Sequence, residues 1–351
     1  MHIQDILAAN ETTFSFEFFP PRTPESSERL SQTIAELEPF APAFVSITYG
    51  AGGTTRELTP DLVLRLRRTT ALDPIPHLTC LGHTEHDIAA MLERYAAAGV
   101  SNLLALRGDP PTGAPMPAGS LARAADLVRT IRQFAHPADR RGFGIGVAGF
   151  PEGHPGMPNR LKEMDYLKAK VDAGADYICT QLFFDNHDFH DFRDRCELAG
   201  IRVPILAGLM PVTSLRGLHR MADLAGGARV PARLLKALQR VDDTDQEVAR
   251  IGIHHATEQC ADLLHHGVAG LHFYTLNQST PTKEILCRLG HREGQKAAAG
   301  FSASQPGGTE SPPPASRSPR IVPGQTAQTA PPALDASRAT PAGETAAAAA
   351  A

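Results

Sequence analysis

The chain has 351 residues, of which 42% are hydrophobic, so it is long enough to bury a large core. Its formal net charge of −4 and pI of about 6.4 give no basic surface for nucleic acid. No apolar run reaches the roughly 18 residues of a transmembrane helix, and residues 1–11 lack the pattern of a signal peptide. We therefore expect a cytoplasmic protein without nucleic-acid or membrane partners.

The first predicted strand, at residues 14–18, carries the most informative pattern in the chain. Phe14, Phe16 and Phe18 alternate with Ser15 and Glu17, so the aromatic and polar side chains face opposite sides. The two prolines that follow end the strand because proline supplies no N–H group. A carboxylate in such an apolar strand is costly to bury unless it is paired, hydrogen-bonded or protonated. The alternative is a solvated glutamate at the end of a strand.

Strand-like runs then alternate with amphipathic helical stretches along the chain. The expected strands lie near residues 14–18, 43–48, 75–80, 102–106, 143–148, 176–182, 203–208 and 269–275. The clearest helical patterns cover residues 25–37, 85–98, 120–134, 161–173 and 247–266. The long interval between the last two strands leaves room for a short additional helix near residues 231–240. Eight such units predict a (β/α)8 TIM barrel. A doubly wound sheet is the alternative, but no G-x-G-x-x-G follows the first strand.

The composition changes sharply near Glu293. Residues 293–351 contain nine of the 29 prolines and a single aromatic residue, Phe301. No segment there has a periodicity that could bury a face. We predict a catalytic barrel at residues 1–292 and a disordered C-terminal tail at residues 293–351.

The five cysteines are odd in number, widely spaced and without a C-x-x-C pair. This spacing favours reduced, mostly buried thiols in the cytosol over a disulfide framework or a zinc site. The helical stretch that contains His254, His255, Cys260, His265 and His266 could suggest a metal site. His254 pairs at i+4 with Glu258 only, and no second pair of ligands stacks beside it, so we expect a solvated histidine-rich face and no metal.

Active sites of (β/α)8 barrels lie where strands end and βα loops begin. The polar residues at these positions form one set: Glu17, Thr48, Tyr49, His77, Thr79, Arg107, Asp109, His154, Gln181 and Asn277. Taken singly, each has an ordinary structural interpretation. The Arg107-Gly108-Asp109 triplet fits a turn with a surface ion pair, and His77 and His154 fit buried core histidines.

Seven segments follow one another along the chain: FSFEFFPP, VSITYGAGG, PHLTC, ALRGDPP, VAGFPEGHP, DAGADYICTQLFFD and LHFYTLN. Together, from about Phe14 to about Gly290, they resemble the methylenetetrahydrofolate reductase family. The resemblance implies an FAD-dependent oxidoreductase that reduces 5,10-methylenetetrahydrofolate to 5-methyltetrahydrofolate with NADH or NADPH. It also implies a ping-pong reaction, a supply of methyl groups for methionine synthesis, and a homo-oligomer.

The resemblance assigns roles to particular residues. Glu17 would be the general acid, which requires a raised pKa at neutral pH, and its apolar strand favours that direction. Asp109, Gln181 and Gln278 would contact the folate substrate. The FAD contacts would be Thr48, Tyr49, Ala51, His77, Arg107, Gly108, Asp109, Ala124, Phe150, His154, Glu163, Tyr166 and Lys170. A cation such as Lys170 suits the charged adenosine diphosphate moiety.

Three positions depart from the family pattern. Gln278 stands where an arginine is frequent, Met221 where some members carry an aromatic residue, and Arg123 where some have tyrosine. Two other kinds of protein remain open at this point. One is another FAD-dependent (β/α)8 oxidoreductase, such as a proline dehydrogenase-like enzyme. The other is a barrel without flavin that binds pterins, as a methyltransferase module does.

Overall fold

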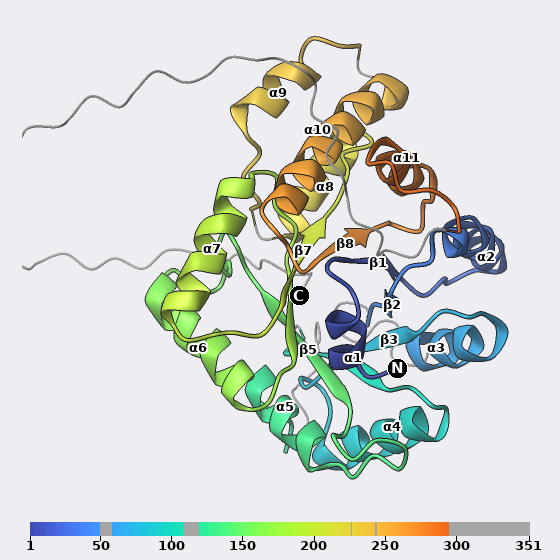
Figure 1. Ribbon diagram of the computed structural model, residues 1–351, viewed down its shortest axis with the longest axis vertical. Helices are drawn as coiled ribbons and strands as arrows, with labels where there is room; N and C mark the ends of the chain where they lie inside the picture. Colours follow the sequence, from blue (N-terminus) through green and yellow to red (C-terminus); the bar gives the residue numbers. More distant parts are fainter. Residues whose placement is uncertain (50–57, 109–118, 226, 243, 295–351) are drawn as a thin grey trace, which may run out of the picture. The chain divides into compact units, whose positions relative to one another are not determined.

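A computed structural model describes residues 1–49, 58–108, 119–225, 227–242 and 244–294. Eight parallel strands form a closed barrel in chain order, and helices surround it (Figure 1). The strands are β1 Thr13–Phe18, β2 Phe44–Ile47, β3 Pro74–Thr79, β4 Asn102–Leu106, β5 Gly144–Gly149, β6 Tyr177–Thr180, β7 Ile205–Leu209 and β8 Gly270–Tyr274. The predicted TIM barrel is confirmed, and the doubly wound alternative is wrong.

The helices of the described residues connect and cover these strands. They are α1 Ile3–Ala8, α2 Pro24–Leu37, α3 Leu58–Thr69, α4 Glu85–Ala97, α5 Ala124–Gln133, α6 Arg160–Asp172, α7 Asn186–Leu198, α8 Leu215–Leu224, α9 Ala232–Leu238, α10 Asp245–His265 and α11 Thr280–Arg288, with a 3-10 turn at Glu38–Phe40. The additional helix expected near residues 231–240 is α9. Together α8 and α9 lengthen the connection between β7 and α10.

The alternation in β1 divides its side chains between two environments. Phe14, Phe16 and Phe18 belong to the large apolar cluster between the strands and the helices. Ser15 and Glu17 face the opposite way, into the barrel, where they meet side chains from other strands. The aromatic face therefore anchors β1 to the outer layer, and the polar face is left for the interior.

Helix α1 closes the amino-terminal end of the barrel. Ile3 and Ile6 pack with interior residues such as Phe44 and Leu104. The backbone N–H of Ile3 donates to Oδ1 of Asn102, at the start of β4, over 2.7 Å. This helix has only 6 residues and little periodicity, so the sequence did not predict it.

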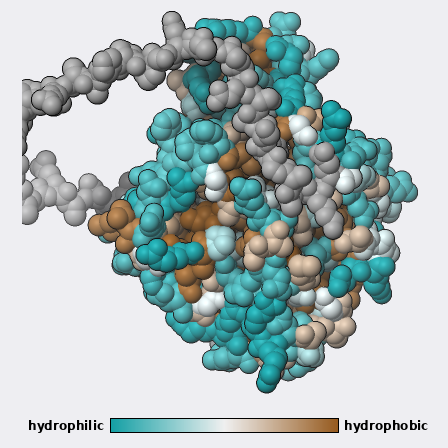
Figure 2. Space-filling view, in the orientation of Figure 1, coloured by the Kyte–Doolittle hydropathy of each residue, from teal (hydrophilic) through white to brown (hydrophobic). Residues whose placement is uncertain are grey.

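The cysteines agree with the expectation of mostly buried thiols. All five cysteines are unpaired, and Cys287 is the exposed one. In the view of Figure 2 the periphery is mostly hydrophilic. Among the described residues, no helix has both the length and the apolar character needed to cross a membrane. The tail predicted at residues 293–351 lies, from residue 295 onward, outside the described residues and stays a prediction.

Candidate active site

The Glu17 carboxylate lies at the centre of a polar cluster inside the carboxyl-terminal half of the barrel. Its Oε2 atom is 3.2 Å from Nε2 of His77 on β3 and 3.4 Å from Nε2 of His272 on β8. The hydroxyl of Ser46 on β2 donates to the same oxygen over 3.1 Å. Three neighbouring strands thus direct polar side chains at one carboxylate, whose side chain is 15% exposed.

His272 extends this cluster toward the middle of the barrel. Its Nδ1 atom lies 2.8 Å from the Ser15 hydroxyl, and its Nε2 atom lies 3.3 Å from that of Ser46. The side chain is almost completely buried. Sequence reasoning did not single out His272, although the alternation in Leu271-His272-Phe273 carried the same signal as the first strand.

The expected raised pKa of Glu17 is wrong for this structure. Burial alone would raise the pKa of the carboxyl group, but His77 and His272 outweigh it and lower the pKa to about 2. Both imidazoles act by favouring the charged carboxylate, through charge and hydrogen bonding. The apolar pattern of the first strand indicated only that the Glu17 carboxyl group is desolvated. Its partners His77 and His272 lie far from it in the sequence, so the pattern could not indicate them. The Glu17 carboxyl group is therefore ionised at neutral pH.

The chain after β8 forms a rim at the carboxyl-terminal end of β1, where the Thr275 hydroxyl donates to the Glu17 backbone oxygen over 2.6 Å. Leu276 and Asn277 both have left-handed backbone conformations, with φ of 50° and 55°, which non-glycine residues rarely adopt. The Asn277 amide exchanges two hydrogen bonds with the backbone of Phe19, at 3.0 and 2.9 Å. The side chains of Phe19 and Leu276 are 43% and 41% exposed. The rim thus presents two apolar side chains, which sequence reasoning missed.

A second group of expected residues gathers at the end of β5 and the start of α6. The ring of Phe150 packs edge-on against His154, with centroids 4.7 Å apart. The backbone N–H of His154 donates to Oε1 of Glu163 over 2.8 Å, and Arg160 pairs with Oε2 of the same carboxylate over 3.1 Å. Three of the residues predicted to contact FAD therefore form one cluster.

Helix α6 brings Tyr166 and Lys170 next to this cluster. The guanidinium of Arg123 lies over the ring of Tyr166, 5.1 Å from its centroid. Ala124 begins α5, whose N-terminus has no side-chain cap. Lys170 donates from Nζ to the backbone oxygen of Ala148, and burial lowers its pKa to about 8. The departure at Arg123 thus places a cation beside a predicted FAD contact.

The remaining predicted FAD contacts follow β2 and β4. The Tyr49 hydroxyl lies 2.9 Å from Nε2 of His83, and the Thr48 backbone N–H donates to the oxygen of Phe18 over 2.9 Å. The Arg107 side chain is exposed and forms no ion pair with another described residue. Gly108 has φ of 78°, and a Cβ there would approach Cβ of Thr79 to 2.8 Å, so this position requires glycine. Ala51 and Asp109 lie outside the described residues.

The predicted folate contacts have different surroundings. Gln181 follows β6, and its Oε1 accepts from the backbone N–H of Leu182 over 2.8 Å. It lines a pocket that also contains Phe150 and Glu152. Gln278 is exposed on the rim after β8. Met221 is buried in an apolar cluster and so does not present a side chain to a ligand here.

Comparisons with known proteins identify the family of the chain. Residues 2–290 match the family model described as methylenetetrahydrofolate reductase. Methylenetetrahydrofolate reductase (NADH) 1 of Arabidopsis thaliana is 40% identical over 300 residues, which cover 82% of this chain and 50% of that protein. The chain therefore spans about half the length of this plant relative. The 5,10-methylenetetrahydrofolate reductase of Escherichia coli K12 is 37% identical over 280 residues, covering 80% of this chain and 91% of that protein.

A solved structure supports the fold. It is an uncharacterized protein from Clostridium thermocellum that binds two copies of 5-methyl-5,6,7,8-tetrahydrofolic acid, with a TM-score of 0.56. The match covers 81% of this chain and 96% of that one, at 17% identity, which supports the barrel alone. The family follows from the sequence matches: the chain belongs to the methylenetetrahydrofolate reductase family.

Proposed function

We propose that the protein reduces 5,10-methylenetetrahydrofolate to 5-methyltetrahydrofolate, with FAD as cofactor and NADH as electron donor. Family membership supports the reaction, and the names of the plant relatives support NADH. The observation that carries the proposal is the Glu17 carboxylate held by His77 and His272 at the carboxyl-terminal ends of the strands. This is where barrels of this kind bind substrates. The proposed ping-pong order and the link to methionine synthesis remain predictions from the family.

The residues of the second group and of helix α6, together with Arg107 and the start of α5, fit an adenosine diphosphate moiety. Arg107 is an exposed cation, Lys170 carries an amine at the same end of the barrel, and α5 begins without a side-chain cap. Unpaired N–H groups and cations are the usual partners of phosphates. Phe150 and Tyr166 offer aromatic surfaces nearby. When bound, FAD would supply the hydride carrier between the nicotinamide and the folate.

Glu17 and His77 supply the proton in this proposal. Opening of the five-membered ring of the substrate requires a proton on one of its nitrogen atoms. In this proposal the neutral form of Glu17 donates the proton to the substrate nitrogen, and the His77 imidazole, 3.2 Å away, is the neighbouring group through which the proton reaches the carboxylate. Glu17 acts as the general acid without a permanently raised pKa.

His272 positions the carboxylate. With Ser15 on one nitrogen and Ser46 and Glu17 near the other, its ring is held inside the barrel. It lies too deep to meet a substrate, so its role is to orient Glu17 and to stabilise its charge after the proton has left. The apolar side chains of Phe19 and Leu276 offer a surface for a flat ring beside this carboxylate.

Two observations on the purified protein test this proposal. The visible spectrum should show bound oxidised flavin, or FAD should be taken up on reconstitution. Addition of methylenetetrahydrofolate to the NADH-reduced protein should then reoxidise the flavin without oxygen. A colourless protein that cannot take up FAD would contradict the cofactor. Flavin that proline reduces, and that folate does not reoxidise, would favour a proline dehydrogenase-like enzyme.

A further inference from the structure

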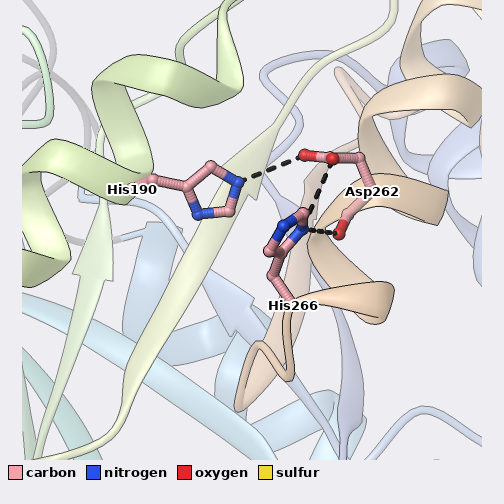
Figure 3. Close-up of side chains that lie close together, drawn as sticks. All are labelled: His190, Asp262 and His266. Atoms are coloured by element: carbon pink, nitrogen blue, oxygen red, sulfur yellow. Dashed lines mark hydrogen bonds and ion pairs between the residues drawn. The ribbon is translucent and has the colours of Figure 1, made fainter. Parts of the chain in front are cut away.

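A group of potential metal ligands lies between two outer helices and is distinct from the cluster around Glu17. His190 of α7 and Asp262 and His266 at the end of α10 point toward one another (Figure 3). One ligand atom from each residue lies within 4.8 Å of the other two. The histidine pattern in α10 had not predicted a metal site, because the third ligand comes from α7.

Two distances in this group are close to those within a coordination shell, and the two imidazoles approach different oxygens of the Asp262 carboxylate. His190 Nε2 lies 3.2 Å from Asp262 Oδ2, and His266 Nδ1 lies 3.4 Å from Asp262 Oδ1. Ligand atoms bound at about 2.0–2.2 Å to a tetrahedral ion lie roughly 3.3–3.6 Å from one another. His266 is 46% exposed, so a rotation of its ring can bring the two imidazoles to the same spacing.

The surroundings favour a cation. Asn186 donates from Nδ2 to Asp262 Oδ2 over 2.7 Å, which fixes the carboxylate from behind. The site lies at the C-terminus of α10, where the helix dipole attracts positive charge. Binding would remove the bond from His266 Nδ1 to the Asp262 carbonyl, but that oxygen still accepts the backbone N–H of His266 over 3.0 Å.

We propose that His190, Asp262 and His266 bind a divalent ion of the zinc class. Two imidazole nitrogens and one carboxylate oxygen suit zinc, cobalt or nickel, whereas magnesium and calcium prefer oxygen ligands. The partial exposure of all three side chains leaves a coordination position for water. His190 Nδ1 is buried without a hydrogen-bond partner among the described residues, so nothing there reinforces this ligand. The site therefore binds more weakly than a structural zinc site with four ligands.

The test uses the full chain without a histidine tag, in a Cys287→Ser background that removes the exposed thiol. After dialysis against a chelator, zinc binding is measured by titration calorimetry for this protein and for His190→Gln, Asp262→Asn and His266→Gln. A matched control is His254→Gln, because His254 and Glu258 form an isolated histidine–carboxylate pair, 3.5 Å apart, on the same helix. Melting temperatures in chelator check that each variant folds.

We expect one zinc ion per chain at this site, binding weakened at least about tenfold in each of the three site variants, and no change in His254→Gln. Zinc should also raise the melting temperature of the parent protein and not that of His190→Gln, because only the complete site joins α7 to α10. The proposal is wrong if His190→Gln binds zinc as tightly as the parent. It is also wrong if Asp262→Asn binds as many zinc ions as the parent.

Discussion

His77 Nε2 and Glu17 Oε2 lie 3.2 Å apart although β3 and β1 are not paired with each other in the sheet. The contact crosses β2, which contributes the Ser46 hydroxyl to the same carboxylate oxygen. Curvature of the barrel makes this possible, because inward-facing side chains of alternate strands converge. The relationship explains how a carboxylate can stay ionised inside an apolar strand.

The low pKa of Glu17 makes a prediction about stability. A folded-state pKa of about 2, below the ordinary value of 4.5, means that the folded protein favours the charged carboxylate. This contribution to the free energy of unfolding is present above about pH 4.5 and is lost as the pH falls toward 2. Urea denaturation across this range should show a smaller loss of stability in Glu17→Gln than in the parent. Equal losses would mean that the histidines do not stabilise the carboxylate.

Lys170 makes a prediction about proton uptake on FAD binding. With its pKa lowered to about 8, most of the amine is neutral at pH 9 in the protein without FAD. A diphosphate close to Nζ would restore the charge, so FAD binding at pH 9 should take up a proton and should weaken as the pH rises above 8. Calorimetry in two buffers with different ionisation enthalpies measures this uptake.

The matched variants for Lys170 are Lys170→Met, which has no charge, and Lys170→Arg, which keeps its charge at this pH. Neither should take up the proton. Uptake that persists in Lys170→Met comes from another group. If the parent shows no uptake, Lys170 serves only the bond to Ala148 that the structure contains.

The sequence predicted the barrel, because hydrophobic alternation and helical periodicity are local properties of the chain. It also indicated that Ser15 and Glu17 share a face, since that follows from the geometry of a strand. It did not predict the pKa direction of Glu17, because His77 and His272 approach it only after the barrel closes. For the same reason the contact of His190 with the end of α10 could not be found by examining one helix.

Gln278 provides a test of substrate affinity. Its side chain is exposed on the rim after β8, where the family frequently has arginine. A cation there should gain one charge-assisted hydrogen bond to a folate carboxylate, worth about 1.5–3 kcal/mol, or roughly tenfold or more in affinity. We expect Gln278→Arg to tighten folate binding without changing flavin reduction by NADH. Gln278→Met is the uncharged control, and similar affinities for both variants would show that this position does not meet a carboxylate.

The contacts of the residues that follow α11 predict how far the chain can be shortened from its C-terminus. His291 is buried against Phe14 and Phe40, and its Nε2 lies 3.0 Å from the Phe40 carbonyl oxygen. Ending the chain after Arg292 keeps this contact and should leave FAD content and turnover within about twofold. Ending it after Leu289 removes His291 and should lower the melting temperature. Loss of FAD in the protein that ends after Arg292 would show that residues 293–351 contribute to the fold.

The central claim is that Glu17 delivers the proton to the folate. Glu17→Gln keeps the shape of the side chain but cannot donate a proton, so it separates the two half-reactions, which rapid-mixing absorbance follows individually. We expect the flavin to be reduced by NADH at the parent rate and its reoxidation by methylenetetrahydrofolate to slow by about 10²–10⁴-fold. Equal slowing of both half-reactions would make Glu17 a structural residue. Reoxidation at the parent rate would contradict the account, because the acid would then lie elsewhere.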